Sequence, residues 1–360
     1  TDPSTGEKRT VTEQIAIKTF KTGKLDDAAT EIRAHQSAMG PTGHENIVGM
    51  KGVVRCPDGS VMMAMEVAKT DADQMIQKLD QAVANGTLSP LAANAIRLTV
   101  MKDMLQGLQH FQETRGMTHA DVKDPNYLIG TDGRAKLADF GTATTGDARW
   151  YGEALVANPR WKAPEILAQD EQRRVDKSGI VTKKKAELEE AMNALDELGL
   201  PKAERTEAGK ELKKGIDVTA KARVEALPDN VVTPKADTWS AGITAYRLFH
   251  GEYPFEADFN SEIEELITEY AKNPDGTLIE MGRDATGNST GKPVTALDRV
   301  LNDMLQVDPA KRPSVTDVLR NPIFDEPFVG SEDAYALIKA LSEENPDPAK
   351  LKALSDKLGD

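Results

Sequence analysis

The stretch Thr-His-Ala-Asp-Val-Lys-Asp-Pro-Asn at residues 118–126, followed by Asp-Phe-Gly at residues 139–141, decides the fold of this chain. It places Asp121, Lys123, Asn126 and Asp139 at spacings that suit transfer of a phosphoryl group from a metal-bound nucleotide. Asp121 would orient a hydroxyl group and accept its proton, and Lys123 would neutralise charge on the moving phosphoryl group. Asn126 and Asp139 supply the hard oxygen ligands that Mg²⁺ prefers.

These residues resemble the catalytic and metal-binding loops of the eukaryotic-type protein kinase family. The family pattern reads here as His-Ala-Asp at 119–121, Asn126, Asp-Phe-Gly at 139–141 and Ala-Pro-Glu at 163–165. One such triplet arises easily by chance, but the whole set in the family's order is a specific signal. The resemblance extends roughly over residues 13–324, apart from one insertion.

The resemblance implies an α+β, bilobal protein-kinase-like fold. A small β-rich N-lobe would occupy residues 1–68, a larger α-helical C-lobe residues 69–326, and a C-terminal helical tail residues 327–360. ATP and Mg²⁺ (or Mn²⁺) would bind in the cleft between the lobes, with a protein substrate beside them. Asp121 would then be the catalytic base, with Lys123 beside it, and Asn126 and Asp139 the metal ligands.

The implied ATP site draws on both lobes. Lys18 lies on a strand predicted at residues 13–20 and would hold the α- and β-phosphates. Glu31, on a helix predicted at residues 27–39, would pair with Lys18, although a separation of 13 residues is short for the family. The remaining contacts implied for the nucleotide come from Ala16, from Met65 behind the base, from backbone groups of Glu66 and Ala68, and from Leu128 under the adenine ring.

Other matched residues have structural roles in the family. His119 and Phe140 would be packing groups that align the two lobes, with Gly141 completing their triplet. Asp237 opens a predicted helix with the sequence Asp-Thr-Trp-Ser-Ala-Gly and would brace the backbone of the catalytic loop. Arg312 matches the arginine that pairs with Glu165 of the Ala-Pro-Glu triplet.

Two departures from the family pattern stand out. The glycine-rich loop that covers the phosphates is not visible in the sequence; it would fall at or before Thr1, and missing upstream sequence is the preferred explanation. Ala120 replaces the family's arginine, which pairs with a phosphate on the activation loop. Alanine cannot bind phosphate, so the sequence predicts an enzyme that does not need activation-loop phosphorylation.

The class of acceptor stays open. Lys123 is typical of Ser/Thr-directed kinases, whereas Pro-Arg-Trp at residues 159–161 is closer to tyrosine-directed ones. The alternative to an active kinase is a pseudokinase that acts as a binding scaffold, favoured by the missing glycine loop and Ala120. The intact set of Lys18, Asp121, Asn126 and Asp139 argues against it. Transfer to a small molecule is disfavoured by the Ala-Pro-Glu triplet, which normally shapes a peptide site.

An insertion follows the Ala-Pro-Glu triplet. Glu165 and Asp237 lie 72 residues apart, about 55 more than the family needs. Helical periodicity at residues 183–198 and 203–214, ended by Gly215, predicts a helical hairpin inserted at about 172–230. It is either a surface decoration or a docking arm for a protein partner. In the tail, amphipathic segments at 334–341 and 348–358 favour packing on the domain.

Composition sets further limits. The chain has 360 residues and a net charge of −14, which argues against a nucleic-acid partner, and no run of 18 apolar residues that would span a membrane. Cys56 is its single cysteine, so an intrachain disulfide is excluded and a reducing, cytoplasmic location is favoured. The alanine-rich composition and the insertion would suit a bacterial, host-directed kinase in the host cytoplasm.

Overall fold

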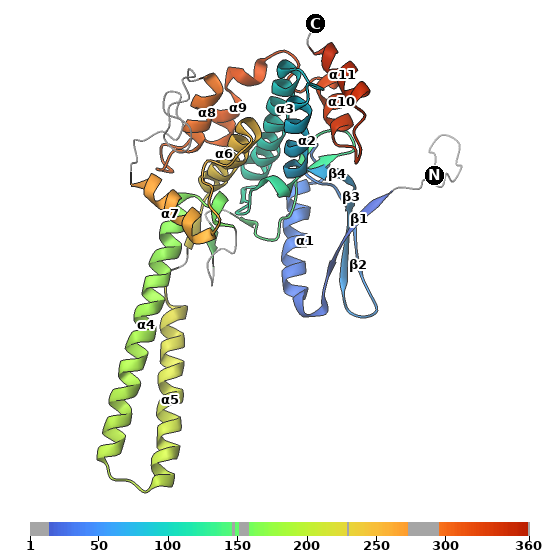
Figure 1. Ribbon diagram of the computed structural model, residues 1–360. Coiled ribbons are helices and arrows are strands. Elements are labelled where there is room, and N and C mark those ends of the chain that lie inside the picture. Colours follow the sequence, from blue (N-terminus) through green and yellow to red (C-terminus); the bar gives the residue numbers. More distant parts are fainter. Residues whose placement is uncertain (1–13, 146–147, 151–157, 229, 273–294, 359–360) are drawn as a thin grey trace.

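The computed structural model describes residues 14–145, 148–150, 158–228, 230–272 and 295–358, with only the backbone at 148–150. A small sheet with one helix lies beside a larger, mostly helical body, and a long helical hairpin projects from that body (Figure 1). The predicted α+β, bilobal fold is therefore confirmed. Within the described ranges, no helix is long and apolar enough to cross a membrane.

The N-lobe is built from an antiparallel sheet with strand order β1-β3-β2 and from helix α1, Leu25–Met39. The strands are β1 (Ile15–Phe20), β2 (Met50–Arg55) and β3 (Val61–Glu66). Helix α1 buries Ala28, Glu31, Ala34, His35 and Ala38, which recur at the helical spacing of one face. Because this face is turned to the sheet, a glutamate on α1 comes within reach of β1.

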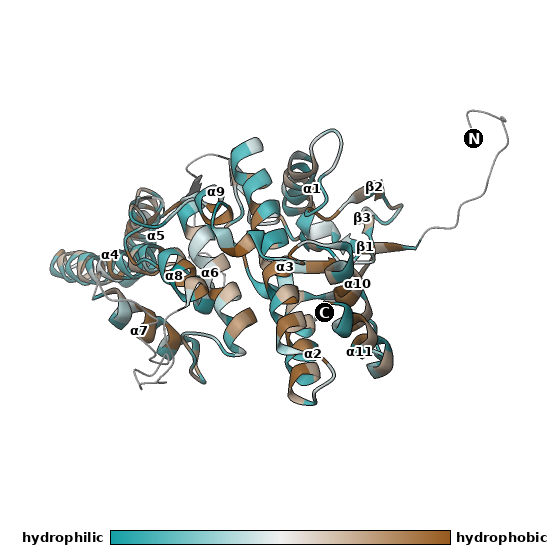
Figure 2. Cartoon of the chain, turned by 90° about the horizontal axis from the view of Figure 1, so that it is seen from above, coloured by the Kyte–Doolittle hydropathy of each residue, from teal (hydrophilic) through white to brown (hydrophobic). Residues whose placement is uncertain are grey.

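The C-lobe is organised around α3 (Pro90–Gln109), which continues into a π-helical turn at His110–Thr114. Apolar residues lie on nearly all faces of α3, as expected for a central helix. Around it lie α2 (Ala72–Ala84), α6 (Pro234–His250), α7 (Asn260–Ala271), α8 (Ala296–Met304) and α9 (Val315–Leu319). Figure 2 shows hydrophobic residues on α2 and α3, which lie between α6 and α8 on one side and α10 and α11 on the other.

Two of the three small sheets in the described part of the C-lobe position its loops. One has strand order β4-β6-β7, formed by β4 (Ala68–Asp71), β6 (Tyr127–Gly130) and β7 (Ala135–Leu137). The turn between the paired strands β6 and β7 contains Asp-Gly at 132–133, with Gly133 at φ 89°, a conformation that favours glycine. The other sheet pairs β5 (Met117–Thr118) with β8 (Thr144–Thr145). The β6–β7 hairpin carries Asn126 just before it and Asp139 just after it.

The inserted hairpin differs from its predicted boundaries. Helix α4 runs without a break from Pro164 to Glu197, and α5 from Lys202 to Glu225, straight through Gly215. The predicted start at residue 183 and stop at Gly215 were therefore wrong. A glycine inside a helix costs only about 1 kcal/mol relative to alanine. Contacts between the helices beyond Gly215 offset that cost, including the pairs Lys184–Asp217 at 2.6 Å and Arg223–Glu187 at 2.9 Å.

The C-terminal tail packs on the C-lobe, as its apolar stripes predicted. It forms α10 (Glu332–Leu341) and α11 (Pro348–Lys357) beside α2 and α3 (Figure 1). The side chains of Leu337, Leu341, Leu351 and Leu358 are buried in the main hydrophobic core. The tail is thus part of the folded unit rather than an appendage.

Candidate active site

A lysine of the N-lobe joins carboxylates from both lobes. The Nζ of Lys18, on β1, lies 2.5 Å from Oε1 of Glu31 on α1 and 3.0 Å from Oδ1 of Asp139. The short separation of Lys18 and Glu31 in sequence suffices because only the 3₁₀ turn Thr22–Lys24 stands between β1 and α1. Lys18, Glu31 and Asp139 therefore meet at one point, where the two lobes face each other.

The charges at this point support one another. Burial by itself would lower the pKa of Lys18, but the hydrogen bonds and charges of Glu31 and Asp139 outweigh it and raise that pKa. Burial would likewise raise the pKa of Asp139, but the Lys18 ammonium outweighs it and lowers that pKa. Both groups are thus charged at neutral pH. Gly141 leaves room here, since a Cβ atom on it would lie 3.3 Å from Oε2 of Glu31.

The catalytic loop forms a second cluster around Asp121. Its Oδ2 accepts hydrogen bonds from Lys123 Nζ at 2.7 Å and from Asn126 Nδ2 at 3.0 Å. Asn126 Nδ2 also donates to the carbonyl of Asp121 at 2.7 Å, so its amide oxygen takes no part in these bonds. The carbonyl of Asn126 accepts from the amide of Ala138 at 2.8 Å. This last bond joins the Asp121 cluster to the residue that precedes Asp139.

A buried carboxylate on α6 braces the loop from below. Asp237 accepts hydrogen bonds from the amides of His119 at 2.8 Å and Ala120 at 2.9 Å. These bonds support Ala120 at φ 64°, a left-handed conformation that is uncommon for residues other than glycine. Burial raises the pKa of Asp237, although the hydrogen bonds from both amides oppose the rise.

The His119 side chain joins the catalytic loop to the segment that precedes Asp139. Its Nε2 donates to the carbonyl of Ala138 at 3.0 Å, and its Nδ1 accepts from the amide of Asp121 at 3.3 Å. Phe140 is fully buried, with ring centroids 4.8 Å from His35 on α1, 5.3 Å from Phe111 and 5.4 Å from His119. This aromatic cluster joins the N-lobe helix to the C-lobe, where the sequence predicted packing groups.

The second structural pair predicted from the sequence lies farther from the cleft. Arg312 is fully buried and donates to both carboxylate oxygens of Glu165, at 2.9 and 3.1 Å. It also donates to the carbonyls of Gln306 and Lys235 and lies over the ring of Trp239. The pair fastens the start of α4 to the segment before α9.

The residues predicted to contact adenine lie along the facing strands. Ala16 on β1 pairs in register with Met65 on β3, and Leu128 lies on β6 opposite Asp71. Glu66 is the last residue of β3, and its amide donates to the carbonyl of Gly49 at 2.8 Å. Ala68 is the first residue of β4. The predicted position of the glycine-rich loop, at or before Thr1, lies outside the described residues.

Several buried polar residues were missed by the sequence reasoning. Asp124, inside the catalytic loop, is fully buried and bonded to Arg247 of α6 and, at 2.7 Å, to the hydroxyl of Tyr253. A second cluster joins Lys162 and Asp170. The sequence does contain a signal for the Asp124–Arg247 pair. Arg247 lies within the apolar run Ala-Tyr-Arg-Leu-Phe at 245–249, and an arginine in such a run needs a buried partner.

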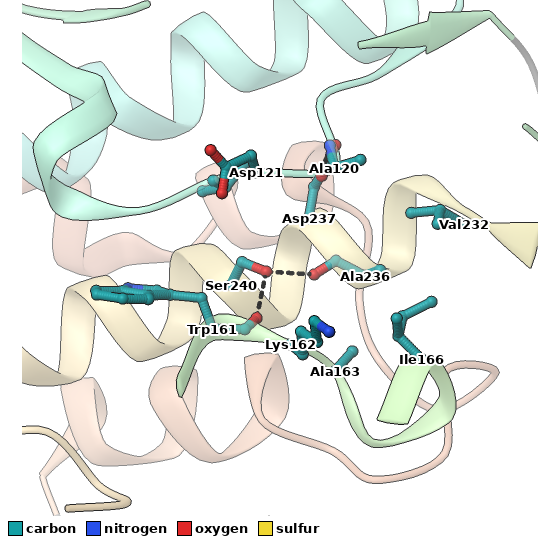
Figure 3. A pocket seen from close by; sticks show the side chains of 11 residues that line it. Ala120, Asp121, Trp161, Lys162, Ala163, Ile166, Val232, Ala236, Asp237 and Ser240 are labelled. Carbon is teal, nitrogen blue, oxygen red and sulfur yellow. Dashed lines mark hydrogen bonds between the residues drawn. The ribbon is translucent and has the colours of Figure 1, made fainter. Parts of the chain in front are cut away.

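A small cavity separates the catalytic loop from the segment that precedes α4. Its volume is about 20 Å³, enough for one water molecule. Asp121, Trp161, Lys162, Val232 and Asp237 are among its lining residues (Figure 3). Ser240 closes one side by donating to the carbonyls of Trp161 at 2.6 Å and Ala236 at 3.0 Å, shown as dashed lines in Figure 3. Asp121 and residues 161–163 thus face the same cavity from its two sides.

Few protein groups are available to the implied metal ion. Among the residues that the structure describes, no group of three or more His, Cys, Asp or Glu side chains could hold a metal. Asn126 and Asp139 instead offer one amide oxygen and one carboxylate, on the segments just before β6 and just after β7, which the Asn126–Ala138 hydrogen bond joins. Mg²⁺ is usually bound through one or two protein groups and the phosphates of its substrate. The residues therefore fit an ion that arrives with a nucleotide.

The two lobes, the Lys18–Glu31 pair and the loop around Asp121 define the architecture of a protein kinase. A family model described as a protein kinase domain matches residues 4–179 and 222–324. The chain belongs to this family. Residues 180–221, the distal part of the α4–α5 hairpin, lie between the two matched segments.

Similar curated proteins are kinases from several eukaryotes. Germinal center kinase 3 of Caenorhabditis elegans is 23% identical over 92% of this chain and 45% of its own length. Serine/threonine-protein kinase TOS3 of Saccharomyces cerevisiae is 24% identical over 83% of this chain and 44% of its own length. Cyclin-dependent kinase 11.2 of C. elegans is 31% identical over 45% of this chain and 23% of its own length. The chain spans less than half the length of these relatives.

Proposed function

We propose that this protein transfers the γ-phosphoryl group of ATP to a hydroxyl group of a protein substrate, with Asp121 as the catalytic base. The observation that carries the proposal is the junction of Lys18, Glu31 and Asp139, with distances of 2.5 and 3.0 Å. This junction brings a phosphate-binding cation of the N-lobe against a metal ligand of the C-lobe. A scaffold without catalysis would have no need of that arrangement.

In the proposed reaction, the nucleotide lies between β1 and β3 on one side and β6 on the other. Ala16, Met65 and Leu128 would contact the adenine ring, and the carbonyl of Glu66 and the amide of Ala68 would bond its edge. Lys18 would bind the α- and β-phosphates. Asn126 and Asp139 would hold Mg²⁺ or Mn²⁺, which when bound supplies charge neutralisation for the phosphates.

The chemical step follows from the hydrogen bonds of Asp121. The substrate hydroxyl oxygen forms a bond to the γ-phosphorus, the bond to the bridging oxygen of ADP breaks, and the hydroxyl proton passes to Asp121. Lys123, 2.7 Å from Asp121 Oδ2, is close enough to stabilise the transferring phosphoryl group. His119 is excluded as the base because both ring nitrogens are engaged, with Ala138 and Asp121.

Serine or threonine is the acceptor that we propose. Lys123 supports this class, and relatives with names such as Serine/threonine-protein kinase TOS3 support it as well. We place the reaction in the cytoplasm, since the free cysteine Cys56 suits a reducing compartment. Phosphoamino-acid analysis of a labelled substrate tests the acceptor class: phosphotyrosine alone would contradict it.

The central experiment is incubation with γ-labelled ATP, Mg²⁺ and a panel of proteins. Asp121→Asn and Asp139→Asn should each lower the rate by about 10²–10⁴, since each removes a group that acts in the transition state. Asp258→Asn, an exposed aspartate in a loop, is the matched control and should keep full activity. ATP binding without transfer by the wild-type protein would support the scaffold alternative instead.

Ala120 leads to a second proposal, activity that does not depend on activation-loop phosphorylation. Thr142, Thr144 and Thr145 would be replaced by valine and Tyr151, which lies outside the described residues, by phenylalanine. The quadruple variant should keep its activity because position 120 has no arginine that could bind a phosphate on the activation loop. Loss of activity in a folded variant would refute this proposal.

The projecting hairpin keeps two interpretations, a surface decoration and a docking arm for a protein partner. Lys184 lies 2.6 Å from Asp217, so the two helices are close together near residues 180 and 221. A short loop can therefore replace residues 180–221 without disturbing the base of the hairpin. Weaker binding of a protein substrate by this deletion variant would support the docking arm, and unchanged binding would reject it.

A further inference from the structure

We propose that Gln169, Asp170 and Asn230 are positioning residues. They hold two segments beside Asp121: the activation segment, which runs between the Asp-Phe-Gly and Ala-Pro-Glu triplets, and within it the proposed peptide-binding segment at residues 158–162. All three lie at the base of the inserted hairpin, on α4 and on strand β10, Asn230–Val232, which leads from α5 into α6. The inference rests on the proposed function because it concerns how a protein acceptor is presented to Asp121.

Strand β10 attaches the activation segment to the hairpin. It pairs antiparallel with β9, Ala148–Trp150, with Val231 opposite Arg149. Successive residues of a strand direct their backbone groups to opposite edges, so one edge of β10 remains for another partner. Gln169 of α4 occupies it: its Oε1 accepts from the amide of Val231 at 2.7 Å, and its Nε2 donates to the carbonyl of Val231 at 3.2 Å. One side-chain amide thereby takes the place of a third strand.

A buried charge cluster fixes the peptide-binding segment to the same strand. Asp170 is 3% exposed and accepts from Lys162 Nζ at 2.9 Å and from Asn230 Nδ2 at 2.6 Å. Lys162 directly follows the turn Pro159–Trp161 and is itself buried. Removing one member of a buried pair leaves an uncompensated charge, so the cluster permits few alternative positions of Lys162.

The cluster is connected to the catalytic residue through the small cavity described above. Val232 of β10, Lys162 and Asp121 line this cavity together, and Figure 3 shows them around it. Arg173 of α4 adds a further anchor, since its guanidinium donates to the carbonyl of Pro228 ahead of β10. A shift of β10 or Lys162 would therefore change the shape of the cavity that Asp121 lines.

These contacts supply what Ala120 lacks. An alanine side chain cannot hold an activation segment through a phosphate. The β9–β10 ladder holds it through backbone hydrogen bonds instead, and Gln169 and Asp170 fasten β10 to α4. The base of the insertion is thus a positioning element, whatever the distal hairpin binds.

The first test compares Q169A with Q172A. Gln172 is an exposed glutamine on the same helix, and its amide bonds only to Asp176 among the contacts described. Loss of the two bonds to Val231 should lower kcat/KM for a protein acceptor about tenfold, mainly through KM, while KM for ATP stays unchanged. Q172A should match the wild type. Equal acceptor KM values for Q169A and Q172A would overturn the proposal.

The second test uses rescue within the buried cluster. D170N leaves Lys162 without its carboxylate, and N230D places two carboxylates together, so both should raise the acceptor KM. The double variant D170N/N230D keeps one carboxylate, one amide and the same net charge, and it should recover part of the lost activity. A double variant that is as poor as the sum of the single variants would count against the cluster as a positioning element.

Hydrogen exchange separates this inference from the proposed function. The backbone amides of β9 and β10 should exchange faster in Q169A than in Q172A, and this readout does not require an acceptor. Equal exchange rates would overturn the positioning role even if the wild type is an active kinase. A wild type that transfers no phosphate would refute the proposed function, while the exchange result would still decide whether Gln169 holds the strand.

Discussion

Asp103 leads to a prediction about the pH dependence of stability. It lies buried on α3, where Oδ1 accepts from the Tyr335 hydroxyl at 2.8 Å and Oδ2 from the amide of Ala135 at 2.9 Å. It therefore joins the C-terminal tail to the β6–β7 hairpin, which is flanked by the proposed metal ligands Asn126 and Asp139. Burial raises the pKa of Asp103 from 3.8 to about 6.

The sign and size of the effect follow from this shift. A carboxyl group with a raised pKa in the folded state adds stability below its unfolded pKa and loses it as the pH rises toward 6. The full pKa shift corresponds to about 3 kcal/mol in the free energy of unfolding. About 2 kcal/mol of this is lost between about pH 4.5 and pH 7.5. Replacing Asp103 by asparagine removes the titration, so wild type should lose about 2 kcal/mol relative to D103N over this range.

The assay is urea unfolding, followed by tryptophan fluorescence, at several pH values in that range. Only the difference in slope between wild type and D103N matters, because other carboxyl groups titrate in both proteins. Y335F removes a hydrogen bond that lowers the pKa of Asp103, so it should move the transition to higher pH. E332Q, at an exposed glutamate of the same tail, is the control. A constant difference between wild type and D103N would refute the reasoning.

Three further predictions concern the cleft and its supports. D121N should lower kcat by about 10²–10⁴ with unchanged ATP affinity, measured by initial rates and nucleotide titration. E31Q should lower kcat/KM for ATP about tenfold, since Lys18 loses a charged partner at 2.5 Å; an unchanged value would contradict the pairing role. E165Q should destabilise the fold by about 3–5 kcal/mol because it leaves the buried Arg312 uncompensated, and denaturant unfolding checks this loss.

The sequence predicted which residues meet in the cleft better than it predicted the long-range contacts that hold the surrounding segments. Asp121, Asn126 and Asp139 lie in short loops around one hairpin, so their spacing alone constrains where their side chains meet. Lys18 and Glu31 meet because a strand and the next helix are joined by a single turn. Local geometry of this kind can be read from spacing. The roles of these residues in catalysis remain predictions until the variants are measured.

Long-range pairings could not be predicted in the same way. Strand β10 has only the residues Asn-Val-Val, too few for a recognisable alternation, and its partner β9 lies about 80 residues earlier in the chain. The bonds of Gln169 and Asp170 depend on that pairing. Likewise, Gly215 resembles a helix stop, and only the packing of α5 against α4 overrides it.

The continuous course of α4 has a mechanical consequence. Its 34 residues correspond to a rod on the order of 50 Å long, which begins at the Ala-Pro-Glu triplet, next to the proposed peptide-binding segment. Because no loop interrupts this rod, a sideways force at its far end acts as torque on the residues at its root. The hairpin therefore acts as a lever. A probe attached to its tip would detect small rotations of the residues at its base, beside the proposed catalytic cleft.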